Sequence, residues 1–240
     1  VAAPIENGAY SIPADNGPSP GTFRVEINWA KKTGRKVPSA DPGFTIEETA
    51  RRLGHARWVE IRLFELLGAW VGDTVDTDVK LRFASASRHC GWHAELLGER
   101  LPTVRELSPQ RQTAPGSPTV VELFDDIAGT TSTAGRMSAL HRVILPHLIA
   151  AYGWHRDRCT PVSDQSVERT LGFLLRDHLD EWRFGEMWLQ QHPPSDPLPR
   201  DRWESLLVSA GGISGNTTIV EPRDIAPDSS RDGSDVEQPA

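Results

Sequence analysis

The chain has 240 residues and a formal net charge of −7 at pH 7. This acidic balance argues against a general nucleic-acid binder, and no apolar run approaches the roughly 18 residues that a membrane span needs. Two cysteines, Cys90 and Cys159, are too few for a disulfide framework, so we expect reduced thiols in a cytoplasmic protein.

The two ends of the chain differ in composition from its centre. Residues 1–43 are rich in Pro, Gly, Asn and Ser without a helical period, which predicts an extended arm on the main domain or on a neighbouring subunit. From Glu221 onward, six acidic residues stand against two arginines. We therefore expect a helical domain over 44–207, followed by a disordered acidic tail over 208–240.

The first two predicted helices cover 45–71 and 76–100. Thr45 and Glu48 fit a capping box, in which a hydroxyl and a carboxylate each satisfy a free backbone N–H group at the helix start. The second helix ends ahead of Pro102. Because only a few residues connect them, these two helices are expected to be antiparallel neighbours.

A proline-rich connection of about 30 residues follows, with a short helix expected over 120–127. The third long helix is expected over 134–156, where Pro146 predicts a kink near its centre. The fourth is expected over 165–191. Four long helices joined by short, long and short connections predict an all-α four-helix bundle with a long crossover between the second and third helices.

A carboxylate interrupts the apolar face of the first helix. Steps of three and four residues place Glu60 on one helix face with apolar side chains. The members of this face are Leu53, Ala56, Glu60, Leu63, Leu67 and Trp70. A lone carboxylate in a core is costly unless something pairs with it, so Glu60 is expected to pair with a basic or metal partner.

Histidines lie at a similar predicted depth on the other helices. Residues equally far from a hairpin turn lie at equal height, which puts Glu60 level with Arg88 and His89, and His141 level with Glu181. His93 and His178 lie on apolar helix faces near the same depth. The candidate metal ligands are therefore Glu60, His89, His93, His141, His178 and Glu181.

In architecture, residues 44–191 resemble the ferritin-like superfamily, whose bundle holds two iron or manganese ions. That family has a Glu on its first and third helices and Glu-x-x-His on its second and fourth. Here only Glu60 matches cleanly: the second helix has Cys90-x-x-His93, the fourth has the reversed His178-x-x-Glu181, and the third offers His141 without a central Glu. The resemblance thus implies the fold but not a standard di-iron site.

Two functions follow from these observations. The departures from the family pattern favour a non-catalytic scaffold or binding protein, which forms a homo-oligomer or binds a protein partner. The shared depth of the polar residues favours the alternative, an oxidase or hydroxylase that uses non-haem iron or manganese with an altered set of His and carboxylate ligands. Cys90 is expected to pack as a small apolar residue, with a thiolate nucleophile as the less favoured reading.

Overall fold

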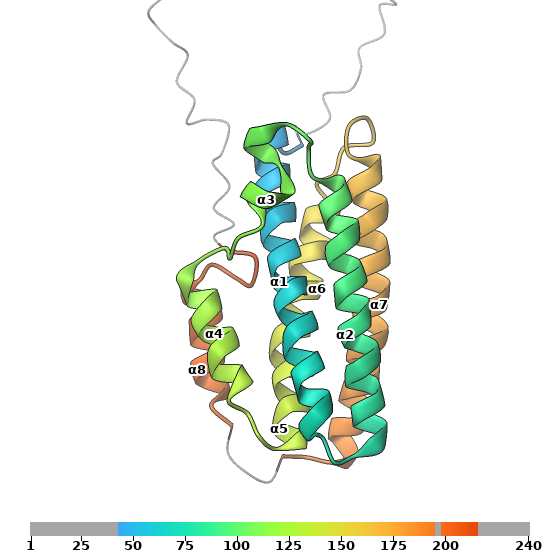
Figure 1. The fold of residues 1–240 in the computed structure, drawn as a ribbon, viewed down its shortest axis with the longest axis vertical. Helices are drawn as coiled ribbons and strands as arrows, with labels where there is room; N and C mark the ends of the chain where they lie inside the picture. The colour runs from blue at the N-terminus through green and yellow to red at the C-terminus, as the bar shows by residue number, and fades with distance from the viewer. Residues whose placement is uncertain (1–42, 195–197, 216–240) are drawn as a thin grey trace, which may run out of the picture. The chain divides into compact units, whose positions relative to one another are not determined.

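The computed structural model describes residues 43–194 and 198–215, and all regular structure within these ranges is helical (Figure 1). The predicted all-α class is therefore confirmed. The arm predicted over 1–43 lies outside the described residues except for Gly43, and so does the predicted tail beyond 215. In chain order the helical segments are α1 (Ile46–Asp73), α2 (Thr77–Arg100), η1 (Arg105–Leu107), α3 (Pro109–Gln112), α4 (Pro118–Ala128), α5 (Thr133–Ser138), η2 (Ala139–Ile144), α6 (Leu145–Arg156), α7 (Gln165–Gln191) and α8 (Arg200–Ser209).

Helices α1 and α2 form the predicted antiparallel pair, and local capping explains where they begin. The Thr45 hydroxyl accepts a hydrogen bond from the Glu48 N–H, as the capping box requires. The Glu48 carboxylate instead forms ion pairs with Arg51 and Arg52, so only half of the box is formed. The Asp76 side chain caps α2 in the same way by accepting from a backbone N–H.

The connection between α2 and α5 runs back along the length of the long helices, so α5 begins at the end of the domain where α1 ends (Figure 1). This is the predicted crossover. It carries η1, α3 and the apolar helix α4. The backbone of Gln112 in α3 packs so closely on α1 that only glycine fits at Gly54.

Helix α8 was not predicted, and it packs along α4. The indole N–H of Trp203 donates to the Asp126 carboxylate at 2.8 Å. Beyond the predicted domain end at Leu207, Ile213 is still buried. The Ser214 carbonyl lies 2.8 Å from His55 Nδ1. The packed chain thus extends at least to Ser214, because buried apolar side chains in α8 and the turn after it complete the core.

The third long helix is continuous over α5, η2 and α6, but η2 is a π-helical segment. Its last turn is closed by a hydrogen bond from the Leu145 N–H to the Leu140 carbonyl, one residue wider than in an α-helix. Pro146 follows directly, and a proline has no N–H and crowds the carbonyl four residues before it. At the position where Pro146 predicted a kink, the structure shows this π-helical turn.

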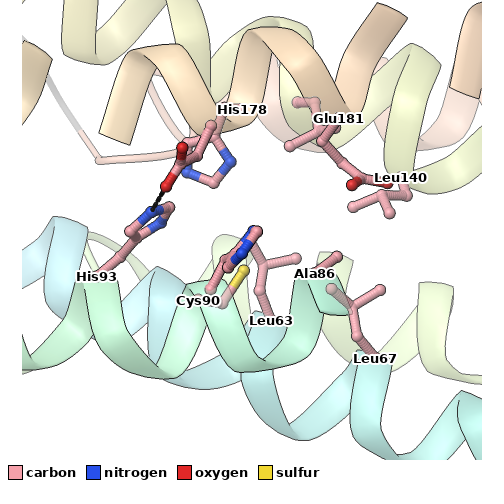
Figure 2. Close-up of a pocket in the computed structure, with 11 residues that line it drawn as sticks. Leu63, Leu67, Ala86, Cys90, His93, Leu140, His178 and Glu181 are labelled. Atoms are coloured by element: carbon pink, nitrogen blue, oxygen red, sulfur yellow. Dashed lines mark hydrogen bonds and ion pairs between the residues drawn. The ribbon is translucent and has the colours of Figure 1, made fainter. Parts of the chain in front are cut away.

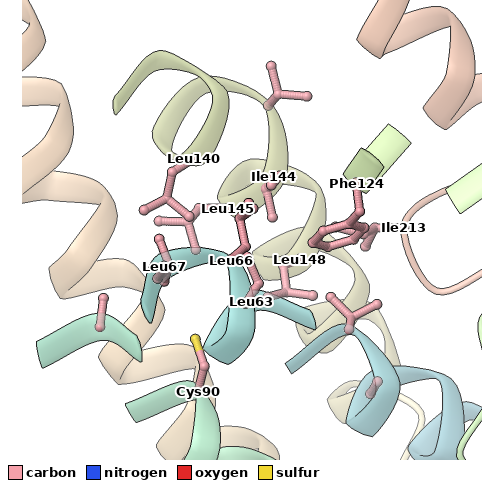
Figure 3. Packing of buried hydrophobic residues seen from close by; sticks show 14 of the residues in the cluster. Leu63, Leu66, Leu67, Cys90, Phe124, Leu140, Ile144, Leu145, Leu148 and Ile213 are labelled. Carbon is pink, nitrogen blue, oxygen red and sulfur yellow. The ribbon is translucent and has the colours of Figure 1, made fainter. Parts of the chain in front are cut away.

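The long helices enclose a single apolar core (Figure 3). Leucines of α1 such as Leu63 and Leu67 meet Leu140 and Leu148 of the third helix, and Phe124 of α4 closes one side. Burying one such side chain contributes about 1.5–3 kcal/mol, compared with about 0–1 kcal/mol for an exposed ion pair. The core therefore dominates stability. No helix in the described part of the chain is long and apolar enough to cross a membrane.

A cation and three aromatic side chains close the end of the domain where α1 begins and α6 ends. The Arg52 guanidinium lies 4.5 Å from the centre of the Phe44 ring and 4.6 Å from that of Trp154. His155 packs edge-on against Phe44 and is buried. Burial first, and then the positive charge of Arg52, lower the pKa of His155 to about 4. His155 is therefore neutral in the native state at neutral pH.

This burial predicts an acid-sensitive contribution to stability. A histidine with a pKa near 6.5 in the unfolded chain and about 4 in the native state binds protons more readily when unfolded. Stability is thus lost as pH falls from about 6.5 towards 4, by on the order of 2 kcal/mol between pH 7 and pH 5. In urea unfolding at these two pH values, His155→Gln should lose correspondingly less than the wild type. The half-exposed His147, changed to Gln, is the control, and equal losses in all three proteins would contradict the prediction.

Candidate metal centre

Three of the predicted polar residues converge in the core, each from a different helix. Glu60 of α1, His93 of α2 and His178 of α7 each offer one ligand atom, and these atoms lie within 4.8 Å of one another. All three residues are buried, with exposures of 0%, 0% and 3%. Figure 2 shows His93 and His178 directed towards each other from facing helices. Of the six predicted ligands, these three lie close enough together to share one metal ion.

The carboxylate of Glu60 has two partners on one of its oxygens. The Tyr152 hydroxyl of α6 donates to Oε1 at 2.8 Å, and His178 Nε2 lies 2.8 Å from the same atom. Tyr152 was missed by sequence reasoning. It lies four residues after Leu148 on the buried face that also carries His141, so the helical period could have revealed it.

His93 lies between two carboxylates. Its Nδ1 is 3.4 Å from Glu60 Oε2, and its Nε2 is 3.1 Å from Asp177 Oδ2. Asp177 was also missed, although steps of three and four place it on the same face of α7 as Leu174 and Glu181. Its side chain is 29% exposed, so it connects the buried imidazole to the protein surface.

The charges in this group support one another against the effect of burial. Burial is the largest influence on Glu60 and raises its pKa, but His178 and His93 together outweigh it and hold the pKa well below its usual range. Burial likewise lowers the pKa of His93, whereas Glu60 and Asp177 raise it to a value above the ordinary one. Burial and Glu60 raise the pKa of Tyr152, which keeps its hydroxyl as a donor.

Two atoms of this group nevertheless have no hydrogen-bond partner within the described part of the chain. They are Glu60 Oε2 and His93 Nδ1, which form an ion pair at 3.4 Å without the geometry of a hydrogen bond. Buried polar atoms without a hydrogen bond are uncommon in folded proteins. Imidazole nitrogen and carboxylate oxygen are ligands for iron, manganese and zinc. The residues present therefore fit a metal ion at this place.

Next to the triad, Glu181 pairs with two basic groups. His141 Nε2 lies 3.2 Å from Glu181 Oε1, and Arg82 Nε lies 2.7 Å from Oε2. The predicted level of His141 with Glu181 is confirmed by this contact. His141 Nδ1 lies 2.8 Å from the Met137 carbonyl, and its ring occupies space that Gly185 leaves open. Each oxygen of Glu181 thus has a basic partner, through an ion pair without hydrogen-bond geometry in the case of Arg82, and both nitrogens of His141 have protein partners.

The predicted register between α1 and α2 was off by about one helical turn. It placed Glu60 opposite Arg88 and His89, whereas the structure places His93 there and leaves Arg88 exposed. His89 is half-buried, and its ring centre lies 6.4 Å from that of His93, outside the triad. The error arises because the turn between the helices fixes their relative height only to within a few residues.

A cavity of about 10 Å³ adjoins the triad, which is on the order of the space that one water molecule occupies. Its walls combine apolar side chains with polar ones, as Figure 2 shows. The lining residues are Leu63, Leu67, Ala86, His89, Cys90, His93, Leu140, Leu145, Asp177, His178 and Glu181. Burial and the Glu60 charge raise the pKa of Cys90 well above its usual range, so Cys90 is a neutral thiol and the nucleophile reading has no support.

Comparison with protein families, with characterised proteins and with solved structures finds no match to this chain.

Proposed function

We propose that this chain binds one transition-metal ion, iron or manganese, through Glu60, His93 and His178, and that it acts as a metal-dependent oxidase or hydroxylase. One observation carries the proposal: Glu60 Oε2 and His93 Nδ1 are buried, face each other at 3.4 Å and lack hydrogen-bond partners within the described ranges. These two atoms form only an ion pair with each other, so both would be available as ligands of a metal ion.

The reaction class rests on the chemistry of these ligands. Two histidines and one carboxylate with open positions form the ligand set of non-haem Fe(II) centres that react with oxygen. The small cavity beside the triad has room for a ligand about the size of water. The third long helix offers the Tyr152 hydroxyl where the ferritin-like family pattern has a Glu ligand, and with one carboxylate fewer this site favours one ion over two.

A second function is favoured by the size of that cavity. An organic substrate does not fit into about 10 Å³, and the Glu60 carboxylate already has protein partners in His178 at 2.8 Å and His93 at 3.4 Å. These facts support a non-catalytic scaffold whose polar core is structural. Large apolar side chains that are about half exposed, namely Phe64, Trp92 and Phe173, suit the homo-oligomer or protein partner that this function needs.

Metal content separates the two functions. The full chain, expressed with iron, manganese and zinc supplied, should contain about one ion per chain by elemental analysis. His93→Ala should lose this ion because it removes one of three ligands. His147→Ala, which removes a half-exposed histidine paired with Glu204, should keep it. An ion-free wild type, or equal content in all three proteins, would favour the scaffold.

A further inference from the structure

Two side chains outside the triad determine which atoms of its ligands are free. The Tyr152 hydroxyl occupies Glu60 Oε1 at 2.8 Å. The Asp177 carboxylate lies 3.1 Å from His93 Nε2. The atoms left over are Glu60 Oε2 and His93 Nδ1, which are the two buried atoms of the triad without partners among the described residues. Tyr152 and Asp177 thus each contact one atom of a triad residue, and the other atom of that residue is the one without a hydrogen bond.

We propose that Tyr152 and Asp177 are positioning residues, which restrict Glu60 to one donor oxygen and present His93 to a metal ion through Nδ1. This inference rests on the proposed metal site and extends it to residues that do not themselves bind the ion. Neither residue belongs to the ligand set predicted from the sequence.

The role of Tyr152 follows from its burial and its single proton. Its exposure is 2%, and its hydroxyl, carried by α6, donates to Glu60 of α1. A phenol is a one-proton donor, so this contact fixes the rotation of the carboxylate and directs Oε2 towards His93. If His178 Nε2 turns its lone pair to an ion, Oε1 loses that donor and keeps only Tyr152.

The role of Asp177 follows from the two distinct nitrogens of an imidazole. A neutral histidine carries its proton on one nitrogen and can bind a metal only through the other. By accepting a hydrogen bond from Nε2, Asp177 holds the proton there and leaves the Nδ1 lone pair for the ion. A carboxylate in this place also raises the basicity of the ligand, and its loss typically weakens metal affinity about 10- to 100-fold.

Titration with Co(II), followed by visible absorption, tests the inference on the full chain. Tyr152→Phe removes only a hydroxyl, and Asp177→Asn keeps the shape of the side chain while removing its charge. Each variant should bind Co(II) about 10-fold more weakly or worse, with a changed absorption spectrum. Asp180→Asn is the matched control, because this exposed residue lies on α7 and pairs with Arg183. Its affinity and spectrum should equal those of the wild type.

The outcomes separate the two proposals. Wild-type affinity and spectrum in both variants would overturn the positioning roles while leaving the metal site in place. A wild type that binds no Co(II) would overturn both. Unfolding curves of the metal-free proteins complete the test: a purely structural role would lower their stability without changing the spectrum of the bound ion, and that result also counts against the inference.

Discussion

Replacing Glu60 by alanine is expected to lower the free energy of unfolding of the metal-free protein by about 3–5 kcal/mol, the range for breaking a buried ion pair on one side. The change leaves the Tyr152 hydroxyl and His178 Nε2 without the acceptor that each has at 2.8 Å. It also leaves His93 with a single carboxylate partner, Asp177. Urea unfolding of the metal-free chain, monitored by circular dichroism, measures the effect.

Glu65→Ala is the matched control on the same helix. Its carboxylate is 52% exposed and pairs with Arg62, so its loss should change stability by less than about 0.5 kcal/mol. A Glu60 variant no less stable than this control would show that the carboxylate does not hold the core together.

Glu60→Gln tests how the contribution of Glu60 to stability depends on pH, because glutamine has no charge to lose. Because the native pKa of Glu60 is depressed, its charge stabilises the fold above about pH 4.5, and this contribution is lost as pH falls further.

The long helices could be predicted closely because their ends are fixed by local chemistry. Thr45 and Asp76 cap α1 and α2 through side-chain oxygens. The predicted range of the fourth helix coincides with α7, Gln165–Gln191, although Asp164 before it makes no capping hydrogen bond. Such signals act over three or four residues and are readable in a sequence. Helix α8, Arg200–Ser209, escaped prediction because only Trp203 and Leu207 of its ten residues are buried, which leaves a weak helical period, and the segment is held by packing against α4.

The candidate site was predictable in part, because the face of a helix on which a residue lies is also set by residues three or four positions away. Helical period placed Glu60, His93 and His178 on buried faces, which required no knowledge of the neighbouring helix. Which buried residues meet depends on the relative height and rotation of two helices, and an error of one turn exchanged His89 for His93 as the partner of Glu60. Helical period could have placed Tyr152 and Asp177 on inward faces, but their pairing with Glu60 and His93 depends on such contacts between helices.

A glycine on α7 is expected to be essential for the second polar pair of the core. A methyl group at Gly185 would overlap the ring of His141, whose atoms are the three nearest to that position. The ring would have to move, breaking its contacts with the Met137 carbonyl and with Glu181 Oε1. Overpacking of this kind costs about 1–3 kcal/mol, so Gly185→Ala should be destabilised by that amount in urea unfolding, despite the higher helix propensity of alanine.

Gly172→Ala on the same helix is the control. Nothing lies within 4 Å of the methyl group there, so this variant should gain up to about 1 kcal/mol from helix propensity. A double-mutant cycle between Gly185→Ala and His141→Ala then locates the cause. Because the overlap is with the His141 ring, removing the ring should relieve it, and the two losses should combine to less than their sum. Additive losses would mean that the methyl group at Gly185 meets something other than His141.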